Sequence, residues 1–429
     1  MSGITVVGGG PAGSMSAMYL AASGRDVTVI EEHRESGKPV HCAGMLSPET
    51  VRMSGVSPDI LGSANSADVV FPNGKVLSIG RRAPMVYFVD RADLDRRMAE
   101  RAMDSGAEFR YGIKCRKVEV SRDYALVQTN QGDMRSDIVV GADGFRSVVS
   151  DSIPGNEPRE LLTGAQYDIE YRMEDQNRIV LRMGSEVAPG FFSWQIPMGD
   201  TTRLGLCISA QGSAPDYLRH LMKISGMEDR RIIARYGGCI PIGRKTSHAD
   251  RIMLIGDAAG QVKPVSGGGL NPIFRAAPYV RDAVDRAYGI GLFSASVMSL
   301  YEAGWRKELS RELSRGERMR KYFLKFSDAE MNLVGQLFDT PAIREKLGMI
   351  DFDDPSAIVR PILAEKGVKS GFLKIRRSGQ ILRSARETRS RSTEKMRSVS
   401  YGQETKRKAS RPWNEWNASR STSSPLKNS

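Results

Sequence analysis

The stretch that decides the fold is ITVVGGGPAG, residues 4–13. Its first four residues form an apolar run typical of a buried strand, and a helix-compatible run at 14–23 follows the glycines. The next apolar run, DVTVI at 26–30, ends in Glu31 and Glu32. An acid at the tip of the second strand accepts hydrogen bonds from a ribose, so this strand–G-x-G-x-x-G–helix–strand pattern predicts a bound dinucleotide.

The residues of this turn have separate physical roles. Gly8 permits the tight turn, Gly10 lets the backbone approach a pyrophosphate, and Gly13 lets the helix pack closely against the strand. Pro11 and Ala12, between these glycines, are also expected to bind the cofactor, and the free N–H groups and positive dipole end of the following helix attract phosphate. We therefore expect the pyrophosphate at the start of this helix.

The charge of the chain lies mostly in its C-terminal tail. The 429 residues are enough for about two or three domains, and their net charge is +13. Residues 371–429 hold 15 Lys and Arg but only 4 Glu, a net of +11, which leaves +2 for residues 1–370. A nearly neutral body gives no reason to expect a nucleic-acid partner. The Ser- and Arg-rich tail is expected to be a disordered, solvated appendage rather than an anchor to anionic lipid or RNA.

The cysteines and the apolar runs indicate where in the cell the protein is found and whether it binds a metal. Cys42, Cys115, Cys207 and Cys239 are widely spaced and form no CxxC pair, so we expect neither a metal site nor a disulfide framework. A reducing cytoplasm is consistent with this usage. No run of about eighteen apolar residues occurs, and the chain enters a strand at once, so neither a membrane-spanning helix nor a signal peptide is expected.

The remaining patterns predict one discontinuous nucleotide-binding domain and an inserted sheet. The sequence predicts a hairpin (67–71 and 75–79), a helix from Asp90 to Ser105, strands at 113–120, 124–129, 136–140, 163–171, 178–183, 191–197, 203–209 and 251–255, and helices at 269–288, 295–325 and 328–338. No repeat of 20–50 residues is present.

The fold class is therefore α/β, in two domains. A Rossmann-type domain takes residues 1–155 and 240–290, an antiparallel sheet for the substrate takes 156–239, and a helical C-terminal part takes 291–369. The basic tail begins at residue 370.

Three glycine-and-acid clusters, each directly after a predicted strand, point to a known group. They are residues 8–13, Gly141-Ala142-Asp143-Gly144 and Gly256-Asp257-Ala258-Ala259-Gly260. In this order they resemble the flavoproteins that include aromatic hydroxylases, flavin halogenases and geranylgeranyl reductases. The resemblance implies FAD as the cofactor, with the first cluster on its pyrophosphate, Asp143 and Gly144 flanking it, and Asp257 holding ribityl or ribose hydroxyls.

The resemblance covers most of residues 1–340 and implies two further contacts with FAD. Arg91 matches the arginine that lies near the FAD in this group. Gly267-Gly268-Gly269-Leu270 opens a helix, and its N–H groups are expected at the flavin's pyrimidine edge or at a phosphate. Positive dipoles at that edge stabilise the anionic reduced flavin.

Two segments narrow the resemblance to archaeal geranylgeranyl reductases. KPVHCAGMLS at 38–47 resembles their loop with a cysteine beside the flavin, which implies that Cys42, Ala43 and Gly44 bind the cofactor and that Cys42 is catalytic. PGFFSWQIP at 189–197 is similar to their P-x-x-Y-x-W-x-F-P signature, which lines a lipid cavity. The expected wall residues are Phe191, Phe192, which replaces the signature Tyr, Trp194, and Ile196, which replaces the signature Phe.

An alternative function stays open at this point. Residues 192–197 lack only the first Trp of the W-x-W-x-I-P of flavin halogenases, so a monooxygenase or halogenase acting on an aromatic substrate is the main alternative. An FAD electron shuttle without lipid chemistry is a second. The Cys42 loop and Pro189 favour the reductase.

The resemblance implies saturation of C=C bonds in the geranylgeranyl chains of an archaeal ether phospholipid, by hydride from reduced flavin plus a proton. The substrate would be an unsaturated isoprenoid ether lipid. No second G-x-G-x-x-G follows a strand, so the electron donor is expected to be ferredoxin or a reduced nicotinamide or deazaflavin carrier. The apolar stripe within Gly316–Asp339 indicates either core or an interfacial helix, which would give peripheral contact at the inner face of the cell membrane. The core interpretation is favoured.

Overall fold

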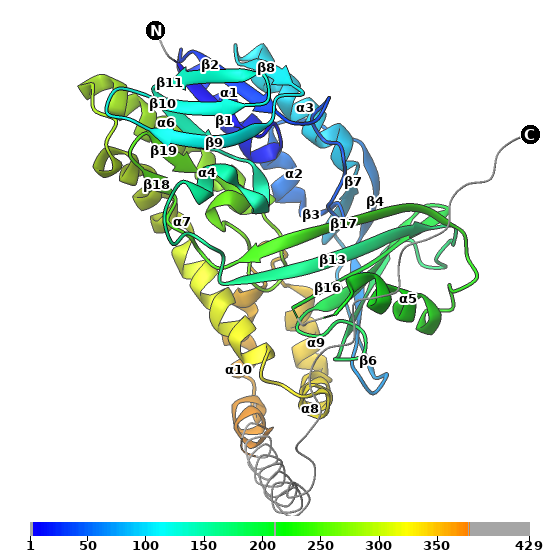
Figure 1. The fold of residues 1–429 in the computed structure, drawn as a ribbon. Helices are drawn as coiled ribbons and strands as arrows, with labels where there is room; N and C mark the ends of the chain where they lie inside the picture. Colours follow the sequence, from blue (N-terminus) through cyan, green and yellow to red (C-terminus); the bar gives the residue numbers. More distant parts are fainter. Residues whose placement is uncertain (1–2, 210–211, 376, 378–429) are drawn as a thin grey trace, which may run out of the picture. The chain divides into compact units, whose positions relative to one another are not determined.

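The computed structural model describes residues 3–209, 212–375 and 377, and residues up to Ile375 form one compact unit. Its first sheet has the strand order β18-β19-β12-β1-β2-β8, and β19, β12, β1, β2 and β8 pair in parallel (Figure 1). The strands are β1 (Ile4–Val7), β2 (Val27–Glu31), β8 (Glu108–Tyr111), β12 (Ile138–Gly141), β18 (His248–Ala249) and β19 (Ile252–Leu254). The predicted Rossmann-type sheet is confirmed.

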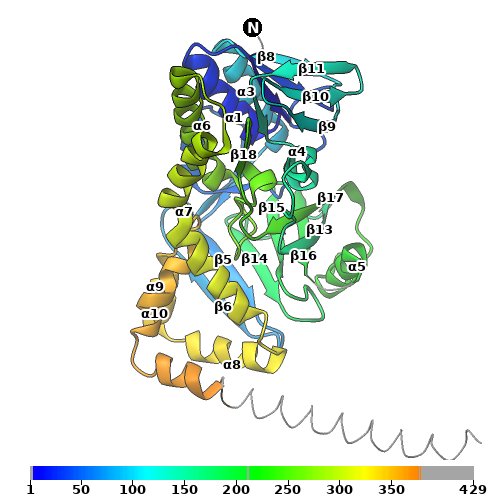
Figure 2. The same ribbon diagram turned by 60° about the vertical axis from the view of Figure 1, so that its left-hand side comes forward.

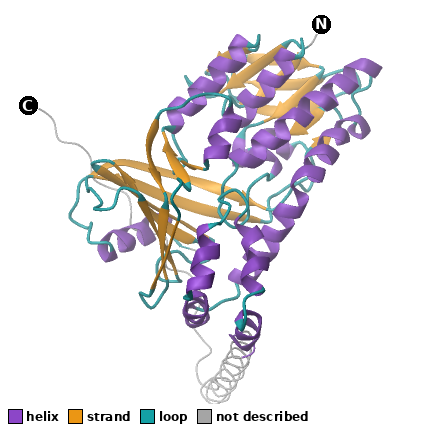
Figure 3. Cartoon of the chain, turned by 180° about the vertical axis from the view of Figure 1, so that it is seen from behind, coloured by secondary structure: helices purple, strands orange, loops and turns teal. Residues whose placement is uncertain are grey.

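This sheet is covered on both faces, as expected for parallel strands rich in Val and Ile. Ile4 and Val6 pack toward a helical layer, whereas Val7 packs toward a small three-stranded sheet on the other face. The small sheet lies in front in Figure 1, and the helices lie in front in Figure 3. The helices are α1 (Pro11–Ala22), α3 (Arg91–Asp104), α6 (Leu270–Ile290) and α7 (Ala295–Phe323), and the opposite layer contains β9 (Cys115–Val120), β10 (Ala125–Thr129), β11 (Gly132–Ser136), η1 (Gly144–Arg146) and α4 (Val148–Asp151). Asp90 caps α3 as predicted, since its side chain accepts hydrogen bonds from the N–H groups of Ala92 and Asp93.

The second sheet has seven strands in the order β17-β13-β16-β15-β14-β5-β6. They are β5 (Ser66–Val70), β6 (Val76–Gly80), β13 (Glu160–Ile169), β14 (Arg178–Met183), β15 (Phe192–Met198), β16 (Thr201–Ile208) and β17 (Ile232–Ile242), and α5 (Ala214–Ile224) packs on β13 and β16. The expected inserted sheet is present. However, the predicted hairpin at 66–80 joins it from outside the 156–239 segment, and β5 pairs in parallel with β14.

A small sheet that the sequence did not predict lies near the cofactor loops. It consists of β3 (Met45–Leu46), β7 (Val86–Val89) and β4 (Ile60–Ala64), and α2 (Pro48–Ser54) follows β3. Ser47 caps α2 through a hydrogen bond from the Thr50 N–H. β3, α2 and β4 carry the chain from the Cys42 loop to the hairpin of the second sheet, and β7 follows the hairpin.

The C-terminal part is helical, as predicted. Helix α7 runs from the first sheet toward α8 (Asp328–Phe338), α9 (Pro341–Gly348), η3 (Pro355–Ile358) and α10 (Val359–Leu363) (Figure 2). The stripe at 316–339 is not one helix, because α7 ends at Phe323 and α8 begins at Asp328. Phe323 and Phe326 pack against Phe71 of the hairpin loop, which agrees with the core interpretation for these two residues. Among the described residues no helix is both long and apolar enough to span a bilayer. The predicted disordered tail begins at residue 370, and this prediction is wrong for its first residues, because 370–375 are helical; from 378 onward the tail lies outside the described residues.

Candidate active site

The glycine turn after β1 has the geometry that the sequence predicts. Gly8 has a φ of +104°, and a Cβ on it would lie 2.5 Å from the Ala142 carbonyl oxygen. A Cβ on Gly13 would lie 1.8 Å from the Gly8 carbonyl oxygen, so only glycine permits this approach of helix to strand. Gly10 meets nothing within 4 Å and lines the main cavity, which leaves its backbone open to a ligand.

The acid at the tip of β2 supports this turn. The Gly9 N–H donates a hydrogen bond of 2.7 Å to Glu31 Oε2, and the His33 N–H donates one of 2.9 Å to Oε1. Glu31 is buried, whereas Glu32 is partly exposed and pairs with Lys114 at 2.6 Å. Glu31 therefore fixes the conformation of the glycine turn. Its predicted contact with a ribose stays a prediction.

A cavity of about 580 Å³ lies between the first sheet and the second. The predicted site residues that line it are Gly10, Pro11, Ala12, Cys42, Ala43, Arg91, Gly144, Phe191, Phe192, Trp194, Asp257, Gly267, Gly268, Gly269 and Leu270. The predicted residues outside its lining are Gly8, Gly13, Glu31, Glu32, Gly44, Asp143 and Ile196. The fold thus brings the three motif clusters, the Cys42 loop and the aromatic segment to one cavity. The roles assigned to individual residues stay predictions.

Among the predicted site residues, Asp257 has the carboxylate most available to a ligand. Its carboxylate lines the cavity from the turn η2 (Gly256–Ala259), and no described residue donates a hydrogen bond to it. Burial raises the pKa of Asp257 to about 6, although the charges of Arg91 and Lys245 oppose that change. The side chain is half-buried and its carboxylate is open to the cavity, so sugar hydroxyls of a bound nucleotide can donate hydrogen bonds to it.

Asp143 differs from Asp257 because its carboxylate is already used within the fold. It accepts a hydrogen bond of 2.5 Å from the Ser147 hydroxyl and one of 3.2 Å from the Val149 N–H. These bonds hold the turn before α4. Gly144, the next residue, reaches the cavity instead.

Arg91 lies at the start of α3 and links several groups of the site. Its guanidinium donates to Asp95 at 2.9 and 3.0 Å, and both side chains are 11% exposed. Burial opposes the charge of Arg91, but Asp95 and then Cys42 raise its pKa above the usual value. A positive charge therefore lies beside the Cys42 thiol and near Asp257.

A second arginine, which the sequence analysis missed, holds the Cys42 loop from the other side. Arg203 on β16 donates to both oxygens of Asp168 on β13, at 2.8 and 2.9 Å, and to the Ala43 carbonyl oxygen at 3.0 Å. The Tyr236 hydroxyl donates to the same carboxylate at 2.9 Å. Asp168 and Arg203 are opposite residues of paired strands, a register that no local pattern reveals. This buried pair attaches the Cys42 loop to the second sheet.

The aromatic segment forms an apolar wall of the cavity. Phe191 and Phe192 stack with ring centroids 4.3 Å apart, and Trp194 meets Phe192 edge-on at 6.3 Å. The Trp194 N–H donates to Gln166 Oε1 at 3.1 Å, which satisfies its one polar atom. Ile196 lies on the same face of β15 but is fully buried behind this wall.

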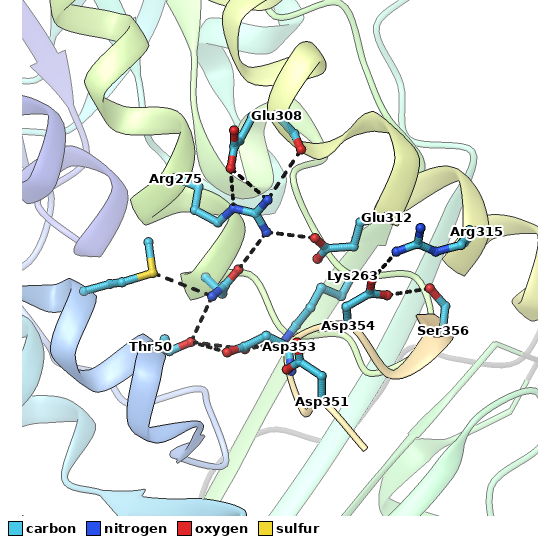
Figure 4. A network of polar contacts seen from close by, with 12 residues as sticks. Thr50, Lys263, Arg275, Glu308, Glu312, Arg315, Asp351, Asp353, Asp354 and Ser356 are labelled. Carbon is cyan, nitrogen blue, oxygen red and sulfur yellow. Dashed lines mark hydrogen bonds and ion pairs between the residues drawn. The ribbon is translucent and has the colours of Figure 1, made fainter. Parts of the chain in front are cut away.

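A polar network closes another side of the cavity (Figure 4). Lys263, in the loop before α6, donates to Asp353 at 3.0 Å and to the Phe352 carbonyl oxygen at 3.3 Å. Asp353 also accepts hydrogen bonds from the hydroxyls of Ser47 and Thr50 at the start of α2. The predicted flavin loop, α2 and the chain after α9 are joined at this point. No local pattern indicates this network, because Ser47 and Asp353 are 306 residues apart.

Comparisons with known proteins agree on the kind of site. Residues 2–179 match the sequence family described as FAD binding domain. Digeranylgeranylglycerophospholipid reductase 2 of Methanopyrus kandleri is 27% identical over 390 residues, which cover 85% of this chain and 96% of that protein. The reductase of the same name from Methanothrix thermoacetophila is 29% identical over 352 residues, covering 77% and 89%. Over most of its length the chain is similar to digeranylgeranylglycerophospholipid reductases. Its cofactor is FAD.

Solved structures show how widely this fold is shared. A geranylgeranyl bacteriochlorophyll reductase-like protein from Thermoplasma acidophilum superposes with a TM-score of 0.76 at 22% identity, covering 87% of this chain and 99% of that one. The halogenase PltM, in complex with phloroglucinol and FAD, gives a TM-score of 0.62 at 15% identity, covering 90% and 92%. Reductases and halogenases thus share this fold.

Proposed function

We propose that this protein is an FAD-dependent reductase that saturates carbon–carbon double bonds in the geranylgeranyl chains of archaeal-type ether phospholipids. One observation carries the proposal. In a single cavity the glycine turn and the unsatisfied Asp257 carboxylate lie with the apolar wall of Phe191, Phe192 and Trp194. The curated relatives named above are digeranylgeranylglycerophospholipid reductases.

The residues of the nucleotide end would hold FAD by its polar parts. Gly10 and the N–H groups at the start of α1 would bind the pyrophosphate, and Asp257 would accept hydrogen bonds from sugar hydroxyls. The N–H groups of Gly267-Gly268-Gly269-Leu270 would face the flavin ring. FAD supplies the hydride equivalent when it is bound and reduced.

Cys42 would supply the proton. An isolated alkene is not polarised, so addition of hydride to one carbon requires a proton at the other. The thiol of Cys42 lines the cavity, and its loop is held between the guanidinium groups of Arg91 and Arg203. Cys42 is therefore the candidate proton donor on this wall of the cavity.

The apolar wall would hold the prenyl chain and exclude water. Stacked Phe191 and Phe192 and the edge-on Trp194 offer no free hydrogen-bonding group to the chain, because the Trp194 N–H is already bound to Gln166. A dry cavity prevents competing reactions with water or oxygen.

The electron donor and the cellular location are further parts of the proposal. We propose ferredoxin or a reduced nicotinamide or deazaflavin carrier as the donor, since the sequence has no second dinucleotide fingerprint. We also propose that the protein works in the cytoplasm, with peripheral contact at the inner face of the cell membrane. The membrane-lipid substrate supports that contact.

The function is tested by anaerobic reoxidation. The FAD-loaded protein is reduced chemically, and digeranylgeranylglycerophospholipid is added without oxygen. The proposal expects flavin reoxidation on lipid addition, whereas saturated lipid of the same headgroup gives none. The halogenase-like fold and the near match to W-x-W-x-I-P define the rival. Reoxidation by oxygen alone, with halide or hydroxyl added to an aromatic compound, would support that rival and overturn the proposal.

A further inference from the structure

The segment between α9 and η3 separates the cavity from a second hollow. We call residues 349–354 the C-terminal strap. Ile350, Phe352 and Asp353 line the 580 Å³ cavity, and they also line a hollow of about 760 Å³. The second hollow is lined largely by charged residues: Glu49, Arg52, Arg81, Arg275, Glu308, Glu312, Asp351 and Asp354. The strap is therefore a thin wall between an apolar space and a charged one.

The strap closes the end of the cavity that lies under the far strands of the second sheet. The cavity is lined by residues from β17 at one edge of that sheet to β6 at the other. Six strand spacings of about 4.8 Å put these two edges of the sheet roughly 29 Å apart. Ile350 and Phe352 pack on the cluster that contains Ile179 of β14 and Ala67 of β5, and Ala43 and Met45 pack on the same cluster, whereas His41 lies beside Gly237 of β17. The cavity is thus lined across the sheet, and the strap closes it beside β14 and β5.

Three anchors fix the position of the strap. Asp353 accepts hydrogen bonds from Ser47, Thr50 and Lys263, and Lys263 also binds the Phe352 carbonyl oxygen. Before the strap, Gly348 lies so close to β6 that a Cβ on it would be 2.6 Å from the Gly80 carbonyl oxygen. After the Phe352–Asp353 pair, Asp354 is bound by Arg315 of α7. Figure 4 shows the contacts of Asp353 and Asp354, and together with the close approach of Gly348 to β6 they hold the strap in place.

We propose that Ile350 and Phe352 determine the longest isoprenoid chain that the cavity accepts, and that Asp353 is the positioning residue that fixes them. This inference rests on the proposed function. A longer chain must either displace the Phe352 ring or place its last carbons in the charged hollow. Apolar carbon gains nothing by leaving water for a space lined by charged groups, so the wall discriminates by length.

The test compares ether lipids with C15, C20 and C25 prenyl chains in anaerobic flavin reoxidation, measured as kcat/KM. Phe352→Ala removes the ring and makes the wall thinner, so the ratio of kcat/KM for the C25 lipid to kcat/KM for the C20 lipid should rise at least tenfold. Ile350→Ala should raise this ratio less. Asp353→Asn frees the strap and should raise the ratio while increasing KM for C20. Phe352→Trp thickens the wall and should shift preference from C20 toward C15. Phe338→Ala is the control, because Phe338 lines neither hollow and its loss should leave the ratio unchanged.

The outcomes separate this inference from the proposed function. The inference is overturned, and the proposed function stands, if the wild-type protein reduces the C20 lipid but the two Phe352 variants keep its chain-length preference. The kcat/KM ratios between chain lengths in Phe352→Ala and Phe352→Trp would then lie within twofold of the wild-type ratios. Equal gains for all chain lengths in Phe352→Ala would also overturn it, because the strap would then control entry rather than length. If the wild-type protein reduces no prenyl lipid, the proposed function itself is overturned.

Discussion

Replacing Arg203 with Met tests whether the buried ion pair on the second sheet supports the Cys42 loop. The substitution keeps a long apolar side chain but removes the cation. Asp168 then retains only the Tyr236 hydroxyl as a partner, and the Ala43 carbonyl oxygen loses its hydrogen bond from the guanidinium. We therefore expect the substitution to lower the free energy of unfolding and to loosen the Cys42 loop.

The magnitude follows from burial. The side chains of Arg203 and Asp168 are only 9% and 15% exposed. Removing one partner of a buried pair destabilises a protein by about 3–5 kcal/mol, because the other charge stays buried. Arg178→Met is a matched control, since Arg178 pairs with Asp68 and Asp175 on the surface, where these side chains are 34%, 22% and 46% exposed. Exposed pairs contribute about 0–1 kcal/mol.

Two assays on the purified protein measure the effect. Chemical denaturation should give a free energy of unfolding for Arg203→Met about 3 kcal/mol or more below that of Arg178→Met. Amide hydrogen exchange, mapped by peptide mass, should be several-fold faster in residues 41–46 of Arg203→Met than in the same residues of Arg178→Met, because the Ala43 carbonyl oxygen has lost its hydrogen bond from the guanidinium. Equal stabilities, or equal exchange rates in this loop, would refute the role of the pair.

Three further substitutions test the nucleotide end and the chemistry. Burial raises the pKa of Asp257 to about 6, so the folded protein holds this proton more tightly than the unfolded chain, and the stability that the proton gives is lost as pH rises through 6. In FAD-free protein, Asp257→Asn should therefore be more stable than wild type at pH 8, by up to about 3 kcal/mol, and equal to it near pH 3. Denaturation at the two pH values measures this difference. The same variant should bind FAD at least tenfold more weakly by titration, through the loss of a charged acceptor. Gly13→Ala should abolish FAD binding, since the new Cβ would overlap the Gly8 carbonyl oxygen; FAD content of the purified variant checks this. Cys42→Ser should keep its FAD but slow lipid reduction by about 10²-fold or more, the usual loss for a positioned proton donor, and an unchanged rate would remove Cys42 from the mechanism.

Local patterns were sufficient for the elements that are stabilised locally. The glycine turn, the Asp90 cap and the hairpin at 66–80 each depend on residues within a few positions of one another, so their sequence decides their structure. Strand β17 was missed because Gly237, Gly238 and Pro241 argue against a strand when read alone. Its pairing with β13 stabilises it nonetheless.

The site was predictable where it depends on motifs and not where it depends on the tertiary fold. Cys42 and Asp257 could be proposed as site residues because each lies in a recognisable segment, and both line the cavity, although their roles stay predictions. Arg203 was missed because its importance comes from a strand register that places it opposite Asp168. Asp353 was missed for a similar reason, since Ser47, Thr50 and Lys263 are its neighbours only in space.

The most direct test of the central claim is the mass of digeranylgeranylglycerophospholipid after anaerobic incubation with the chemically reduced, FAD-loaded protein. The account predicts that lipid mass rises in steps of two hydrogens, with one double bond saturated for each equivalent of reduced flavin consumed. A lipid of unchanged mass beside a flavin that stays reduced would contradict it.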